Sequence, residues 1–168
     1  QLVVDDPSAY EKLKQAMTFL LTIDGVPMIY YGDEIGMTGA GDPDNRRMMR
    51  FGDQVSAAED SVRVHFSKLA HARRGHPSLY LGSRRVLLAD QDHYAYVRAY
   101  NGDLALVAFN RSAAPVTLTL ELQPEMDNVM LDEVLSGRTL KIANGQALLT
   151  LEPMSSVVFV NGSALDAN

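Results

Sequence analysis

The sequence predicts an α/β segment followed by an all-β antiparallel domain, and two observations carry this prediction. Hydrophobic residues recur with helical spacing over residues 6–75, whereas residues 83–162 alternate with the two-residue period of strands and contain regular turn signals. This change of period near Gly82 divides the chain into two predicted domains, 1–82 and 83–168. A chain of 168 residues is long enough to bury a hydrophobic core.

A first helix is predicted over residues 6–23. Asp6 suits the N-cap and Pro7 the first helical position, and Asp24-Gly25 ends the pattern. Its apolar stripe, at i, i+4, i+7 and i+8, consists of Leu13, Met17, Leu20 and Leu21. Such a stripe is typical of a helix that packs on a sheet.

A buried strand is predicted next, over residues 26–31. This run is apolar without alternation, as is typical of a strand covered on both faces in a parallel sheet. Residues 36–54 then read as one long polar loop, and a capping box formed by Ser56 and Glu59 begins a second helix over 56–75. The order helix, buried strand, loop, helix indicates part of a parallel α/β fold.

The second half predicts a small β-sandwich of short antiparallel strands. Asn101-Gly102 and Asn144-Gly145 are hairpin turn signals. The strands that we expect cover residues 94–100, 104–109, 116–122, 129–134, 140–143, 147–151 and 156–160.

Composition excludes several classes of function. Residues are 46% hydrophobic and 21% charged, which favours a folded globular protein over disorder. The net charge of −6 disfavours nucleic acid or an anionic membrane as a partner, since both need clustered Lys and Arg. The absence of cysteine excludes a thiolate nucleophile and cysteine-ligated metal, and the four histidines lack metal-site spacing. We therefore predict no cofactor and no metal.

The loop after the predicted buried strand is the most chemically dense part of the chain. Six charged side chains lie within fifteen residues there: Asp33, Glu34, Asp42, Asp44, Arg46 and Arg47. Loops at the carboxyl ends of parallel strands carry the sites of such folds. Asp42 and Arg46 could bracket a neutral polyol, because a carboxylate accepts from hydroxyls and a guanidinium donates to them. The alternative is that the two merely pair with each other on a solvated loop.

These residues also carry a family resemblance. The run from Gly25 to Met37 (GVPMIYYGDEIGM) closely resembles the eighth-strand motif of the α-amylase superfamily, glycoside hydrolase family 13. Residues 41–47 (GDPDNRR) resemble the loop that follows it, in the form of the neopullulanase and cyclomaltodextrinase branch. The resemblance implies that residues 1–82 are the end of a TIM (β/α)8 barrel, namely helix 7, strand 8 and helix 8. Residues 83–168 would then be a Greek-key β-sandwich C-terminal domain.

The resemblance further implies retaining cleavage of α-1,4 or α-1,6 glucosidic bonds in maltooligosaccharides or starch-derived glucans. Asp42 and Arg46 match the family's pair that hydrogen-bonds glucose units, so α-glucan oligosaccharides are the expected partners. The family's three catalytic carboxylates lie on strands that would precede Gln1, and the missing initiator Met also suggests a piece of a longer chain. We therefore expect no catalytic residue in this chain and no activity from it alone. Glu34 is expected to support the barrel top.

The sequence departs from the family at Phe51, where family members usually carry Trp. Phe51 could stack on a sugar face or fill core. Arg73-Arg74 and Arg84-Arg85 flank the domain junction and are expected to form salt bridges across it. Tyr94, Tyr96 and Tyr100 share one strand face and are expected to pack between the two domains.

Two other functions stay open at this point. The chain could be a non-catalytic β-sandwich module that binds carbohydrate or protein, with residues 1–82 as a helical adaptor. Transglycosylases and isomerases of the same superfamily share the motifs. In isolation, residues 83–162 are expected to be the stable unit. Residues 1–82 are expected to be non-native or to self-associate, because strand 26–31 and both helices would lack the rest of their sheet.

Overall fold

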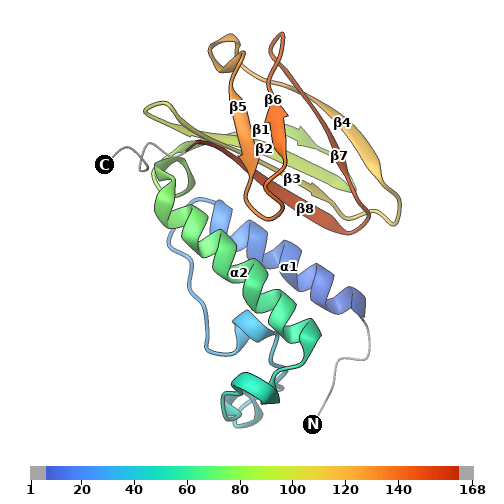
Figure 1. The fold of residues 1–168 in the computed structure, drawn as a ribbon. Coiled ribbons are helices and arrows are strands. Elements are labelled where there is room, and N and C mark those ends of the chain that lie inside the picture. Colours follow the sequence, from blue (N-terminus) through green and yellow to red (C-terminus); the bar gives the residue numbers. More distant parts are fainter. Residues whose placement is uncertain (1–6, 163–168) are drawn as a thin grey trace.

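The computed structural model describes residues 7–162 and has two helices followed by antiparallel strands (Figure 1). The helices are α1 (Pro7–Thr22) and α2 (Ala57–Gly75), and short 3-10 turns are η1 (Asp33–Ile35), η2 (Asp44–Arg46), η3 (Gly52–Gln54), η4 (Pro77–Leu79) and η5 (Pro124–Met126). The strands are β1 (Ser83–Ala89), β2 (His93–Tyr100), β3 (Asp103–Asn110), β4 (Val116–Glu121), β5 (Met130–Glu133), β6 (Thr139–Lys141), β7 (Gln146–Leu151) and β8 (Ser155–Asn161). The N-cap expected at Asp6 lies outside the described residues.

The strands form two sheets. One has six strands in the order β1-β2-β3-β8-β5-β6, and the other pairs β4 with β7. All pairings are antiparallel. Both predicted hairpin turns are confirmed: Asn101-Gly102 and Asn144-Gly145 adopt positive φ, 46° and 84° in the first and 55° and 71° in the second.

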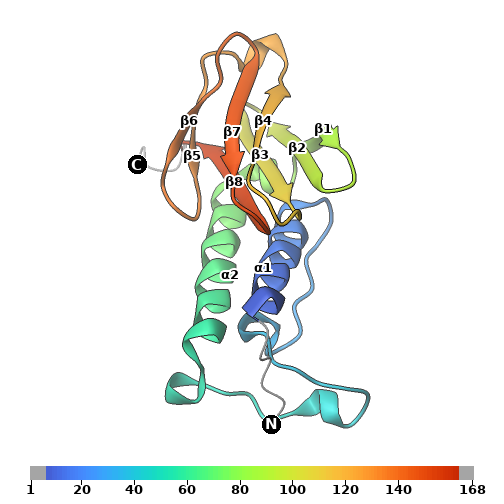
Figure 2. The ribbon, with the colours of Figure 1, turned by 90° about the vertical axis from the view of Figure 1, so that its right-hand side faces the viewer.

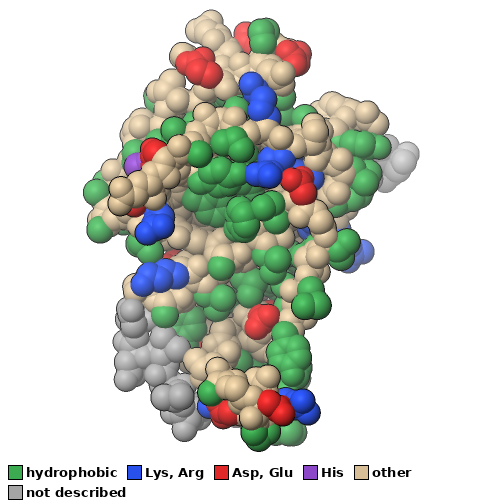
Figure 3. All heavy atoms as spheres, turned by 180° about the vertical axis from the view of Figure 1, so that it is seen from behind, with side chains coloured by type: hydrophobic (Ala, Val, Ile, Leu, Met, Phe, Trp, Pro, Cys, Tyr) green, Lys and Arg blue, Asp and Glu red, His purple; other side chains and the backbone are tan. Residues whose placement is uncertain are grey.

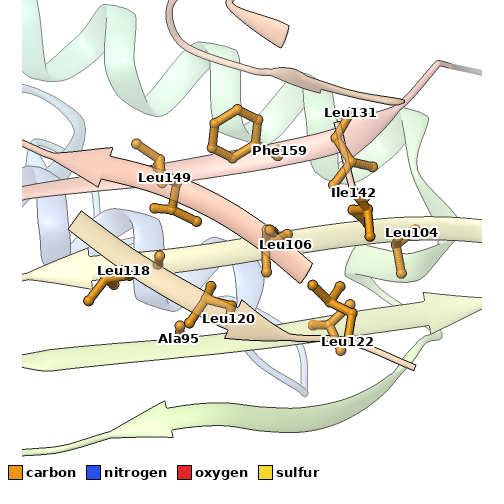
Figure 4. Close-up of a cluster of buried hydrophobic side chains, with 14 of the residues drawn as sticks. Ala95, Leu104, Leu106, Leu118, Leu120, Leu122, Leu131, Ile142, Leu149 and Phe159 are labelled. Carbon is orange, nitrogen blue, oxygen red and sulfur yellow. The ribbon is translucent and has the colours of Figure 1, made fainter. Parts of the chain in front are cut away.

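The main hydrophobic core lies between the two sheets (Figure 4). Alternation along β4 points Leu118 and Leu120 inward, opposite Leu106 and Phe159 of the larger sheet. Leu106, Leu120 and Phe159 are each at most 2% exposed. Burying a side chain of this size contributes roughly 1.5–3 kcal/mol, so this core favours the packing of the two sheets against each other.

Helices α1 and α2 cover the opposite face of the six-stranded sheet, side by side (Figure 2). Met17 and Leu21 of the first predicted stripe are buried, as are Val62 and Leu69 of α2. Leu21 and Leu69 pack against the second face of the six-stranded sheet, so this part of the two stripes is covered, contrary to the expectation that both stripes lose their sheet. No helix within residues 7–162 is long and apolar enough to cross a membrane.

The predicted buried strand over residues 26–31 is not formed, which corrects that prediction. The segment runs outside the helices without strand pairing, and Val26 and Met28 are 95% and 86% exposed. Hydrophobic side chains are exposed in several groups on the face seen in Figure 3. A strand inside a parallel sheet needs a neighbouring strand on each side to satisfy its backbone hydrogen bonds. Within residues 7–162, no strand pairs with this segment.

Three arginines join the helices to the β domain. Arg84 pairs with Asp24 across the junction at 3.0 Å, which agrees with the expected salt bridge. Arg73 instead donates to backbone carbonyls, among them those of Leu21 and Gly25. Arg98 on β2, which the sequence did not single out, is buried there and also reaches Asp24.

Tyr94 and Tyr96 lie where the sequence predicted, between the helices and the sheet. The Tyr96 hydroxyl is 2.6 Å from Thr22 Oγ1, and the Tyr94 ring lies 6.5 Å from that of Phe19 on α1. Tyr100, at the end of β2, is 38% exposed and belongs to neither core cluster.

Candidate functional site

The charged loop lies at the end of the helices remote from the sheets (Figure 2). It begins with a tight turn in which Gly32 and Gly36 have φ of 94° and 64°, conformations that suit glycine. The Glu34 carboxylate accepts a hydrogen bond from the backbone N–H of Gly32 at 2.8 Å. The Asp33 carboxylate accepts one from Tyr30 at 3.1 Å. Both carboxylates therefore hold the turn.

Asp42 and Arg46 form an ion pair at the tip of this loop. Arg46 Nε lies 2.9 Å from Asp42 Oδ1, as the spacing of four residues allows. The side chains of Arg46 and Asp42 are 69% and 61% exposed. The two predicted site residues thus pair with each other on the solvated loop, which is the alternative that the sequence left open. Their role in binding a sugar stays a prediction, and their remaining donors and acceptors face solvent.

A second pair in the same loop, Asp44 and Arg47, is less exposed than the first. Arg47 donates from Nε and NH2 to the two oxygens of Asp44 at 2.8 and 2.7 Å, and from NH1 to Thr38 Oγ1 at 3.2 Å. Asp44 also accepts from the backbone N–H of Ala40 at 2.8 Å. The hydrogen bond from Ala40 and the one from Arg47 lower the pKa of Asp44, so the carboxylate stays ionised.

Two clefts adjoin the loop, of about 660 Å³ and about 220 Å³. Arg47 lies in the wall of both, and Tyr31 and Asn45 line the smaller one. In the described part of the chain, neither Asp42 nor Arg46 lines either cleft. Sequence reasoning did not identify Arg47 as a residue that lines the clefts. Its spacing of three residues from Asp44 did signal that the two could pair.

The loop ends at the predicted capping box of α2, which is confirmed. Ser56 N–H donates to Glu59 Oε2 at 2.8 Å, and Glu59 N–H donates to Ser56 Oγ at 3.3 Å. Arg50 also donates to the buried Glu59, and this bond lowers the pKa of Glu59. Phe51 is 68% exposed, so it does not fill core and could meet a ligand.

The histidines have contacts within the protein. His65 Nε2 lies 2.9 Å from Thr18 Oγ1, His76 Nδ1 lies 2.9 Å from Asp103 Oδ1, and His93 contacts Asp90. Across residues 7–162, no three His, Asp or Glu side chains gather as a metal site requires.

Two protein-family models match this chain. The model of the alpha amylase catalytic domain matches residues 3–87, and that of the maltogenic amylase C-terminal domain matches residues 84–158. The beta/alpha-amylase of Paenibacillus polymyxa is 36% identical over 151 residues, 89% of this chain and 12% of that protein. A cyclomaltodextrin glucanotransferase of Niallia circulans is 37% identical over 138 residues, 80% of this chain and 19% of that protein. The chain thus spans a small part of the length of both relatives.

Solved structures agree with these matches. The alpha-amylase of Geobacillus thermoleovorans, solved with acarbose, superposes with a TM-score of 0.80 at 27% identity, over 95% of this chain and 34% of that chain. The gamma-CGTase of alkalophilic Bacillus clarkii gives 0.74 at 33% identity, over 97% of this chain and 24% of that one. The finer assignment to the neopullulanase and cyclomaltodextrinase branch stays a prediction.

The predicted family is confirmed by two matches that follow one another along the chain. The catalytic-domain model covers about half of the residues, and the C-terminal-domain model continues from its end. The chain therefore belongs to the α-amylase superfamily, glycoside hydrolase family 13, and corresponds to its C-terminal portion.

Proposed function

We propose that this chain is the C-terminal part of an α-glucan-active enzyme and supplies substrate-binding residues to it. The observation that carries the proposal is the exposed pair Asp42 and Arg46, on the loop that follows the family's eighth-strand motif. An acarbose-bound relative of the same fold supports an oligosaccharide as the ligand. Asp42 would accept hydrogen bonds from glucose hydroxyls, and Arg46 would donate to them.

The bond cleavage itself would use carboxylates outside residues 1–168. In a retaining glycosidase, one carboxylate attacks the anomeric carbon while a carboxylic acid roughly 5 Å away protonates the leaving oxygen. Asp42 and Arg46 neutralise each other in a solvated pair, which suits binding of a neutral sugar better than either catalytic role. We therefore assign them to substrate binding, with no catalytic residue in this chain.

The same proposal covers the architecture. Residues 1–82 would be the end of the (β/α)8 barrel, in which segment 26–31 becomes the eighth strand once its neighbouring strands are present. Residues 83–168 would be the Greek-key β-sandwich domain. The absence of strand pairing in segment 26–31 supports this, since no strand within residues 7–162 occupies the positions that neighbouring barrel strands would take.

Transglycosylation is the second candidate reaction. Cyclomaltodextrin glucanotransferases are among the relatives, at 34–41% identity. Chromatography of the products that the parent enzyme makes from maltoheptaose separates the two reactions. Shorter linear glucans alone indicate hydrolysis, whereas longer or cyclic products indicate transfer.

The binding role is tested with Asp42→Ala and Arg46→Ala in the parent enzyme. Each variant loses hydrogen bonds to a charged group, about 1.5–3 kcal/mol, so KM for maltooligosaccharides should rise roughly tenfold to hundredfold. The melting temperature should stay unchanged, because exposed ion pairs contribute little stability.

A matched control exists on α2, where Asp60 and Arg63 form an exposed pair at 2.8 Å. Asp60→Ala and Arg63→Ala should leave both KM and the melting temperature unchanged. Unchanged KM in the Asp42 and Arg46 variants, with a large loss of stability, would show that the pair at the loop tip is structural.

A further inference from the structure

The loop that carries Asp42 and Arg46 is closed by the side chain of Arg47. Three of its nitrogens are used: two bind both oxygens of Asp44 and the third donates to Thr38. Asp44 extends this closure to the backbone N–H of Ala40. One carboxylate and one guanidinium thus join residues 38 and 40, on one side of Asp42, to residues 44 and 47 on the other side.

Two further contacts fix the same closure. The Tyr31 hydroxyl donates to the backbone carbonyl of Arg47 at 3.1 Å. A Cβ added at Gly39 would lie 3.0 Å from Asn45 Cα, so the backbone before Asp42 already touches the backbone after it. The backbone on either side of Asp42 and Arg46 is therefore held in place from both ends.

Asp42 and Arg46 themselves contribute little to this closure. Within the described residues their ion-pair contact is with each other, and both are more than 60% exposed. By contrast, the side chains of Arg47 and Asp44 are 30% and 40% exposed. The fold separates an inner pair that holds the loop from an outer pair that it presents to solvent.

We propose that Asp44 and Arg47 are positioning residues, which hold Asp42 and Arg46 in the geometry that binds the sugar. The inference rests on the proposed function and identifies the residues that hold its binding pair in place. A bidentate pair fixes both distance and plane, and a preformed site binds more tightly because less ordering occurs on binding. An exposed loop of this kind would otherwise have to be ordered by the glucan.

The test is Asp44→Asn in the parent enzyme, alone and combined with the double variant Asp42→Ala/Arg46→Ala, with Asp60→Asn as the control. Asp44→Asn should raise KM for maltooligosaccharides about tenfold, whereas kcat stays nearly constant. Added to the Asp42→Ala/Arg46→Ala double variant, it should change KM by less than about twofold, because Asp44 acts only through these two residues. Asp44→Glu, which keeps the carboxylate, should recover part of the affinity.

A second readout does not depend on sugar. Hydrogen exchange across residues 38–47 in the unliganded enzyme should become faster in Asp44→Asn and stay unchanged in Asp60→Asn. Unchanged exchange overturns the proposal, as does unchanged KM. An equal rise of KM in both backgrounds also overturns it, since Asp44 would then contact the sugar directly. If the double variant Asp42→Ala/Arg46→Ala leaves KM unchanged, the proposed function itself fails. If that variant raises KM but Asp44→Asn does not, only the positioning role fails.

Discussion

Replacing Arg98 with Met should destabilise the contact between the helices and the β domain. Arg98 is 2% exposed and donates to the carbonyls of Thr22 at 3.0 Å, Leu79 at 2.9 Å and Gly82 at 2.6 Å. Its NH2 also lies 3.0 Å from Asp24 Oδ1, with which it forms an ion pair. In the variant, Leu79 would keep its bond from Arg73 and Asp24 its pair with Arg84. The carbonyls of Thr22 and Gly82 would lose the bond from Arg98.

The expected loss follows from those two acceptors. A buried polar group left unsatisfied costs about 1–3 kcal/mol, so two cost about 2–6 kcal/mol. Met offsets part of this, because no charge is then buried. Arg98 Nε also has no hydrogen-bond partner in the described structure. We expect a net loss of about 2–4 kcal/mol in the free energy of unfolding.

Urea denaturation of residues 1–168 measures this loss, with Arg85→Met on exposed β1 as the control. The control should change stability by less than about 0.5 kcal/mol. If Arg98→Met were as stable as the control, the arginine would not hold the junction and the reasoning would be refuted.

Three further predictions concern pH, segment 26–31 and activity. Burial lowers the pKa of His65 to about 4 from 6.5. The unfolded state therefore binds more protons between those values, and stability should fall by up to about 3 kcal/mol as pH drops through this window. Urea titrations of wild type and His65→Gln at pH 4–7 should differ by this amount, and parallel curves would contradict it. Amide hydrogen exchange across residues 26–31 should be fast in dilute monomer, where this segment has no strand partner, and slow in any self-associated form. Strong protection in the monomer would refute the proposal that the segment needs neighbouring barrel strands to become ordered. The 168-residue chain alone should not cleave maltooligosaccharides, and turnover at an ordinary enzymatic rate, about 1–1000 per second, would contradict the absence of catalytic residues.

Local pattern predicted the elements whose burial is decided nearby. Alternation found β4 and β7, and the capping box found the start of α2. The sequence did not predict β1, because this edge strand is mostly exposed and its ladder is irregular between Val86 and Leu88. Without alternating burial, an edge strand leaves no period to detect.

Segment 26–31 shows the opposite limit. Its unbroken apolar run predicted a strand, but strand formation depends on neighbours that the run itself does not supply. The site divides in the same way. The spacing of Asp42 and Arg46 left two outcomes open, and the structure shows the one in which they pair with each other. Their contact with a sugar stays a prediction. That Arg47 lines the clefts depends on the course of the loop, which spacing alone does not determine.

The most direct test of the binding role is a crystal structure of the parent enzyme with a bound maltooligosaccharide. We expect glucose hydroxyls within about 3.2 Å of the Asp42 carboxylate and the Arg46 guanidinium, with the Asp44–Arg47 pair unchanged. A glucan bound in the enzyme's cleft with Asp42 and Arg46 still paired only to each other would contradict the account.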